Sequence, residues 1–185
     1  MSKIKHPIGL RTLFFTEMWE RMSYYGMRGI LVLFMTASIN NGGLDFSNAS
    51  ASAIYGIYAA AVYLMALPGG WLADNIFGQQ KTILFGGIVI MFGHLSLAVP
   101  NMTFFYLGLI LVVMGTGLLK PNISAIVGGL YEKNPSMKES GFTIFYMSIN
   151  IGSILGFFIC GYLGENIGWH YGFGAAGIGM LLGVL

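Results

Sequence analysis

The side chains best suited to chemistry stand in one apolar stretch near the start of the 185-residue chain. Six polar residues recur there at i, i+3, i+4, i+7, i+8 and i+11: Glu17, Glu20, Arg21, Tyr24, Tyr25 and Arg28. This spacing places all six on a single face of an α-helix, so two acids and two arginines form one charged stripe. If the stripe met lipid, each charge would cost about 2.5 to 3.5 kcal/mol at the bilayer centre. The stripe must therefore face a protein interior or a water-filled cavity.

The charged stripe has two interpretations. In the first, its charges only satisfy one another, Glu17 with Arg21, and Glu20 with Arg21 or Arg28. Buried ion pairs contribute little stability, however, because desolvation offsets most of their attraction. An isolated glutamate is also more easily explained as a neutral, hydrogen-bonded core residue than two glutamates beside an arginine. The density of charge favours the second interpretation, a functional site.

A third cation, Lys120 in "GTGLLKPNISA", lies deep in another apolar stretch, too far from either end to reach the interface comfortably. With Lys120 included, the apolar stretches carry two negative and three positive side chains, an excess of one positive charge. Such an excess suits an anion or a carboxylate, which arginine can hold through two parallel hydrogen bonds. Tyrosine hydroxyls and an amide such as Asn150 can serve the neutral polar atoms of a ligand.

The two glutamates suggest a second role for the stripe. When a glutamate accepts a proton, its hold on a neighbouring arginine or lysine weakens. Protonation and the release of a cation for a ligand carboxylate then become coupled events. Charged and titratable groups inside a membrane typically mark such proton and substrate pathways. The stripe has the chemistry of a proton-coupled carrier.

The elements that must position these residues are membrane-spanning helices. The chain is 56% hydrophobic and only 9% charged, with a mean hydropathy of +0.74, whereas soluble domains carry about 25% charged residues. Its apolar runs are long enough to cross a hydrocarbon core of about 30 Å as helices, and the alternation of barrel strands is absent. The runs cover about 10–39, 50–73, 81–99, 102–130, 140–163 and 170–185. The sequence predicts an all-α integral membrane protein.

Short breaks between the runs make consecutive helices antiparallel neighbours, so the spans should form one up-and-down bundle. Pro68 and Pro121 should kink their spans rather than end them, because both spans continue past the proline. The basic residues at or beyond the span ends lie in the N-terminal tail and in the second and fourth breaks, which predicts a cytoplasmic N-terminus. These residues are Lys3, Lys5, Arg11, Lys81, Lys133 and Lys138.

The chain stops inside its sixth apolar run, so we expect a fragment, or the ordered part, of a longer protein. Its one cysteine, Cys160, lies in an apolar run and is expected to pack as a small hydrophobe. Cysteine therefore offers neither a disulfide framework nor a metal cluster. Because the spans hold no nucleophile with a positioned base and no metal cluster, we expect no enzyme and no cofactor.

Several motifs resemble one family. "EMWERMSYYG" resembles the first-helix motif of proton-coupled oligopeptide transporters, a branch of the major facilitator superfamily. "GGWLADNIFGQQKTILFGG" and "FTIFYMSINIGSI" are similar to the two signatures of that family, and "GTGLLKPN" to its fourth helix. The resemblance implies a major facilitator fold, in which two six-helix bundles enclose a cavity near the midplane. Residues 1–185 resemble the N-terminal six-transmembrane-helix bundle, and the C-terminal bundle is absent from this chain.

The resemblance also implies roles for individual residues. In the family, the matching positions line a site for di- and tripeptides, with the basic side chains toward the peptide carboxylate: Arg21, Tyr24, Tyr25, Arg28, Tyr63, Lys120 and Asn150. Glu17, Glu20 and Arg21 match the proton-coupling motif. Asp74 and Gly78 match the cytoplasmic gate loop, where the alternative for Asp74 is a helix cap. One departure is Gly56, which stands where animal members carry a histidine.

The expected function is proton-coupled symport of di- and tripeptides across the cytoplasmic membrane by alternating access, with protons as coupling ion and no nucleic acid partner. The short loops favour a bacterial inner membrane. We expect the missing bundle to supply an acidic residue that faces Arg28 and Lys120 and binds the peptide's amino end. The alternatives are a related carrier of nitrate or another small anion, and a membrane module that senses peptides without transporting them.

Overall fold

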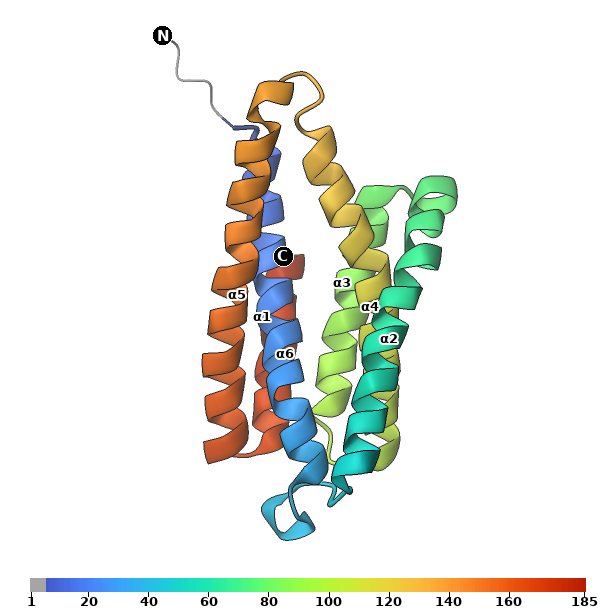
Figure 1. The fold of residues 1–185 in the computed structure, drawn as a ribbon, viewed down its shortest axis with the longest axis vertical. Helices are drawn as coiled ribbons and strands as arrows, with labels where there is room; N and C mark the ends of the chain where they lie inside the picture. Colours follow the sequence, from blue (N-terminus) through green and yellow to red (C-terminus); the bar gives the residue numbers. More distant parts are fainter. Residues whose placement is uncertain (1–5) are drawn as a thin grey trace.

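The structure is a computed structural model that describes residues 6–185, so Lys3 and Lys5 lie outside the described residues. Over this range the chain folds into six α-helices that run up and down, which confirms the predicted helical bundle (Figure 1). The helices are α1 (Ile8–Thr36), α2 (Asn48–Leu72), α3 (Gln79–Leu97), α4 (Met102–Gly129), α5 (Lys138–Asn166) and α6 (Trp169–Val184). Short 3₁₀ turns lie in the α1–α2 and α4–α5 loops, at Ile39–Asn41 and Pro135–Met137.

By length and composition, four helical segments of the described chain qualify as membrane spans: Asn48–Phe77, Gln79–Leu97, Met102–Gly129 and Pro135–Asn166. Helix α1 has 29 residues and is long enough, but it contains the charged stripe. Helix α6 has 16 residues, which gives a rise of about 24 Å. Composition alone thus singles out α1 as the helix that must hide its polar face inside protein.

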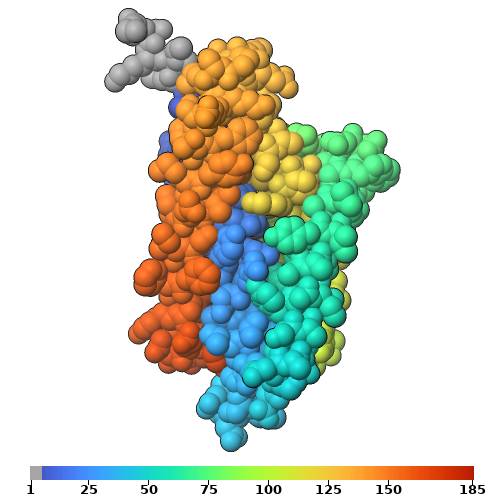
Figure 2. Space-filling view, in the orientation of Figure 1, coloured from blue at the N-terminus to red at the C-terminus, as the bar shows by residue number. Residues whose placement is uncertain are grey.

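The bundle consists of two groups of three helices. In one group α1 packs against α5 and α6, and in the other α4 packs against α2 and α3, while α3 and α6 form the seam between the groups. Figure 2 shows α1 between α5 and α2 on one face of the molecule, with α4 beside it. The charged stripe of α1 therefore lies where the two groups meet.

Helices α1 and α5 touch backbone to backbone. A Cβ atom added at Gly152 would lie 2.2 Å from the backbone oxygen of Met18, and one added at Gly156 would lie 2.4 Å from that of Met22. Small residues allow this approach, the usual way in which membrane helices pack. Cys160, one turn further along α5, is fully buried against Gly26 and packs as a hydrophobe, as predicted. The approach fixes the depth and rotation of the charged stripe relative to α5.

Both prolines lie inside helices, as predicted: Pro68 in α2 and Pro121 in α4. A proline inside a helix frees the carbonyl four residues earlier, because it has no N–H and its ring clashes there. Beside it, the amide of Asn122 donates hydrogen bonds to the carbonyls of Leu118 at 2.6 Å and of Gly69 on α2 at 3.3 Å. Asn122 thus links α4 to α2 directly after Pro121, two residues from Lys120.

The loop between α2 and α3 is a π turn, Ala73–Phe77, followed by Gly78. Gly78 adopts φ +80°, a left-handed conformation that favours glycine. The N-cap of α3 is Gly78, whereas Asp74 is exposed inside the turn. The interpretation of Asp74 as the cap of the following helix is therefore wrong, because the chain stays helical for three residues beyond it.

Candidate functional site

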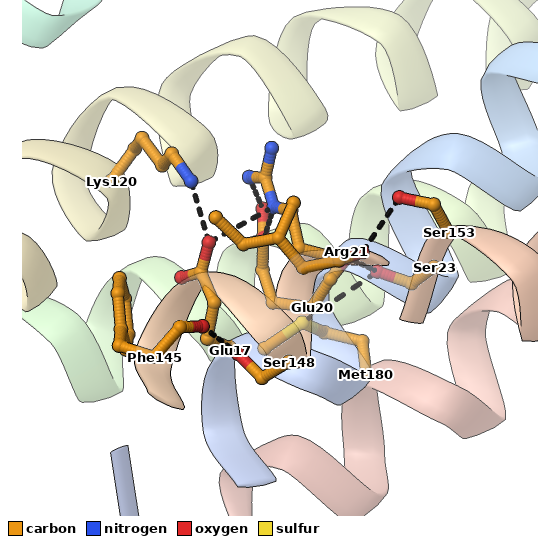
Figure 3. Close-up of polar contacts among 10 residues, drawn as sticks. Glu17, Glu20, Arg21, Ser23, Lys120, Phe145, Ser148, Ser153 and Met180 are labelled. Carbon is orange, nitrogen blue, oxygen red and sulfur yellow. Dashed lines mark hydrogen bonds and ion pairs between the residues drawn. The ribbon is translucent and has the colours of Figure 1, made fainter. Parts of the chain in front are cut away.

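A cluster of four charged side chains lies between α1 and α4 (Figure 3). Glu17 and Glu20 are 0% exposed and Arg21 is 5% exposed, so the charged stripe faces the protein interior at this level. Arg21 donates from Nη2 to Glu20 Oε1 at 2.5 Å and from Nε to Glu20 Oε2. This bidentate pair matches the planar guanidinium to the planar carboxylate and uses one edge of each.

Glu17 lies between two cations. Its Oε1 accepts a hydrogen bond from Lys120 Nζ at 2.5 Å and is 3.4 Å from Arg21 Nε, so the Glu17–Arg21 pair of the first interpretation is present. Lys120 reaches this oxygen from α4, and its side chain is 36% exposed. The other oxygen, Oε2, is buried and has no hydrogen-bond partner in the described part of the chain. A buried carboxylate oxygen without a partner is a place where a proton can be held.

Hydroxyl groups near the two carboxylates do not serve them. Ser23 donates to the backbone oxygen of Glu20 at 2.8 Å, and Ser148 of α5 donates to the backbone oxygen of Phe145 at 2.6 Å. Such bonds from serine to the preceding turn are common inside helices. The negative charge of Glu17 and Glu20 is therefore balanced by Arg21 and Lys120 alone among the described residues.

Arg28 lies seven residues after Arg21 on α1, which is about 10 Å along the helix axis. Its Nε donates a hydrogen bond to the hydroxyl of Tyr55 on α2, and its guanidinium carbon is 5.1 Å from the centre of the Tyr55 ring. The side chain is partly buried. No carboxylate of residues 6–185 lies within 4 Å of it. The surplus positive charge that the count of side chains predicts is therefore located on Arg28.

Tyr24 and Tyr25 enclose Arg21 on its remaining sides. The guanidinium carbon of Arg21 is 4.9 Å from the centre of the Tyr24 ring and 5.7 Å from that of Tyr25. Cations are attracted to the faces of aromatic rings at such distances. Arg21 is thus engaged by carboxylates and rings in this conformation rather than open to a ligand, and its contact with substrate stays a prediction.

The other predicted substrate residues lie on uncovered faces of the bundle. Tyr63 is 76% exposed on α2 and Asn150 is exposed on α5. Within residues 6–185 neither is hydrogen-bonded to the charged cluster, so their roles stay predictions too. Asp74 and Gly78 line a cavity of about 730 Å³ between the α2–α3 loop and the end of α4, and Lys81 and Glu132 line it as well.

Tyr55 is the residue that sequence reasoning missed. It lies seven residues after the start of α2, and Arg28 lies eight residues before the end of α1. In antiparallel neighbours this places both at nearly the same depth, about 10 to 12 Å from the helix ends that the α1–α2 loop joins. The pair would have been found by counting from that loop, had the helix bounds been known to within one residue.

Comparisons with known proteins identify the family of the chain. A family model described as "POT family" matches residues 80–185. The chain belongs to the POT family. It is 53% identical over 181 residues to the uncharacterized transporter YclF of Bacillus subtilis, covering 97% of this chain and 37% of that protein. It is 48% identical over 178 residues to a di-/tripeptide transporter of Lactococcus lactis, covering 95% of this chain and 36% of that protein.

Solved structures of the POT family have the same bundle. A crystal structure of the peptide transporter POT in complex with sulfate matches with a TM-score of 0.94 and 47% identity, covering 100% of this chain and 38% of that chain. A POT family transporter in complex with a thioalcohol-conjugated peptide matches with a TM-score of 0.92 and 40% identity, covering 98% and 38%. The chain thus spans little more than a third of the relatives that it matches, and it has their integral membrane fold, part of the major facilitator architecture.

Proposed function

We propose that this chain is the N-terminal bundle of a proton-coupled symporter of di- and tripeptides that works by alternating access, and that it is no enzyme. One observation carries the proposal. Glu17 of α1 is buried, has one unpartnered oxygen and is held by two cations, and Arg28, about three turns further along the same helix, has no carboxylate partner in the described chain. The relatives named as peptide transporters support peptides as the substrate class.

The proton step centres on Glu17. When its free oxygen accepts a proton, the carboxyl becomes neutral, and the attraction that holds Lys120 at 2.5 Å is lost. Because the Lys120 side chain is already 36% exposed, it can turn toward a ligand carboxylate without unpacking α4. Protonation of Glu17 thus allows a ligand carboxylate to replace Glu17 as the anion bound to Lys120. Proton uptake and ligand binding are thereby coupled. Glu20 contributes by holding Arg21 in place beside Glu17.

The substrate step centres on Arg28 and Lys120. Together they offer two cations on facing helices to one peptide carboxylate, while Tyr24, Tyr25, Tyr63 and Asn150 are available for the neutral atoms of the peptide. The positively charged amino end needs an acidic partner, and we assign that partner to a C-terminal bundle outside residues 1–185. Protons are the coupling ion, and the site needs no cofactor.

The distribution of charge supports a cytoplasmic N-terminus in the bacterial inner membrane. Arg11 lies near the start of α1, Lys81 near the start of α3, Lys133 in the α4–α5 loop and Lys138 at the first residue of α5. Because the helices alternate in direction, these positions gather at one end of the bundle (Figure 1). An excess of lysine and arginine marks the cytoplasmic side of a membrane protein.

Uptake by proteoliposomes tests the proposal. With the complete polypeptide reconstituted, labelled dialanine should accumulate when the outside is made acidic, and a protonophore should abolish the accumulation. If the vesicles instead accumulate nitrate and take up no peptide, the protein is an anion carrier. If they bind dialanine without accumulating it, the bundle belongs to a peptide sensor.

A further inference from the structure

The contact between Arg28 and Tyr55 differs in kind from the other contacts of the intramembrane cations. Arg21 and Lys120 are held by carboxylates, which neutralise them. Arg28 is held by a neutral hydroxyl on a different helix, while the face of the same tyrosine lies 5.1 Å from its guanidinium carbon. Tyr55 therefore contacts Arg28 through both its hydroxyl and its ring. Neither contact neutralises the positive charge of Arg28.

The atoms used by Tyr55 decide which atoms of Arg28 remain. A guanidinium can bind a carboxylate in two planar ways, through Nε with one terminal nitrogen or through both terminal nitrogens. Arg21 uses the first way on Glu20, through Nε and Nη2. In Arg28 the Nε hydrogen is already donated to Tyr55. A ligand carboxylate must then be bound through the two terminal nitrogens, Nη1 and Nη2.

We propose that Tyr55 is a positioning residue that orients Arg28 so that its two terminal nitrogens bind the carboxyl end of the peptide, an inference that rests on the proposed function. Tyr55 already orders the long, flexible side chain of Arg28 in the free protein. The conformational entropy of that side chain is therefore not lost when the ligand binds. Because Tyr55 acts on substrate only through Arg28, its effect must appear in substrates with a free carboxylate and must vanish when Arg28 is absent.

The position of Tyr55 on α2 adds a specificity element. Helices α1 and α2 lie close together at the end that their loop joins and diverge toward the other end (Figure 1). Tyr55 lies near the closed end, so it holds Arg28 at a set distance from that loop. The terminal nitrogens of Arg28 then define the end of the binding space at which the peptide carboxylate lies. Peptides with a C-terminal amide are disfavoured because the amide has no negative charge to pair with Arg28.

Initial uptake rates in proteoliposomes containing the complete polypeptide test this inference. Tyr55→Phe keeps the ring and removes the hydroxyl, and it should raise KM for dialanine about fivefold to tenfold, the size expected for the loss of one ordinary hydrogen bond, while kcat changes less than twofold. Its effect on KM for dialanine amide should stay below twofold. Tyr162→Phe, at an exposed position of α5, is the matched control and should behave as wild type.

A double substitution separates positioning from direct contact. If Tyr55 acts through Arg28, the variant with both Arg28→Ala and Tyr55→Phe should have the KM of Arg28→Ala alone, within twofold. A KM for Tyr55→Phe equal to that of wild type, an equal rise for the amide, or a further rise in the double variant each overturns the inference. Absence of proton-driven dialanine uptake by the wild-type protein would instead overturn the proposed function, so the two failures are distinct.

Discussion

Helix α1 carries two arginines on one face whose surroundings are opposite. Arg21 is buried, paired through two hydrogen bonds with Glu20 and close to Glu17, and covered by two aromatic rings. Arg28 is partly exposed and is held by the neutral hydroxyl of Tyr55. The charge of Arg21 is neutralised by carboxylates, whereas Arg28 has no carboxylate partner among the described residues. Residue type and helical register are the same in both, so the difference comes from the neighbouring helices.

The comparison also concerns the electrostatic field that the cluster around Arg21 exerts on Arg28. The cluster around Arg21 is balanced, with Glu17 and Glu20 against Arg21 and Lys120. It therefore exerts little net field on Arg28 about 10 Å away. Under the proposed function, adding a proton to Glu17 makes the cluster positive, which draws a carboxylate toward Lys120 and Arg28 together. In this proposal, coupling arises from a change in the net charge of one region.

The largest effect is expected from removing the buried arginine. Arg21→Ala leaves Glu17 and Glu20 buried with Lys120 as their remaining cation, and breaking a buried pair in this way costs about 3 to 5 kcal/mol. The purified variant should unfold at a markedly lower temperature in detergent, as measured by loss of a monodisperse peak after heating. Arg28→Ala is the control and should lose about 1 kcal/mol or less. Equal destabilisation by both would abolish the contrast between the two arginines.

A second effect concerns coupling alone. Glu20→Gln removes the charge that holds Arg21 but keeps the shape, so uphill, proton-driven uptake of dialanine should be lost while exchange of peptide across the membrane continues. Counterflow of labelled against unlabelled dialanine measures the exchange, and accumulation under an inward proton gradient measures the coupling. Undiminished accumulation would remove Glu20 from the proton pathway.

A third effect concerns the unneutralised cation. Arg28→Ala should raise KM for dialanine about tenfold or more, because a charge-assisted hydrogen bond contributes about 1.5 to 3 kcal/mol. Lys120→Ala should weaken binding in the same direction. For C-terminally amidated peptides both losses should be much smaller, and an equal loss for the amide would show that neither cation binds the carboxylate.

The smallest effect is expected at a buried hydroxyl of α5, that of Ser148. Ser148 donates to the Phe145 carbonyl rather than to Glu17, so Ser148→Ala should change proton-driven uptake less than twofold. A loss of accumulation in this variant with normal exchange would mean that Ser148 turns to the free oxygen of Glu17 during transport, and that the cluster has a fifth member.

Much of the molecule follows from the sequence by itself. The composition and the apolar runs predict the helical membrane bundle, and the i, i+3, i+4 spacing predicts one charged face and the Glu17–Arg21 pair, because both follow from local periodicity. That the helices continue past Pro68 and Pro121 follows from the apolar runs on both sides of each proline. The surplus of one positive charge is a count that needs no fold.

Only the tertiary structure decides which cation carries that surplus. The sequence allowed Glu20 to pair with Arg21 or with Arg28, and the outcome depends on Lys120 reaching Glu17 from α4 and on Tyr55 reaching Arg28 from α2. These contacts join residues 103 and 27 positions apart, and they depend on how α4 and α2 pack against α1. Charge is a property of the chain, but its neutralisation depends on distances between helices, and only packing sets those.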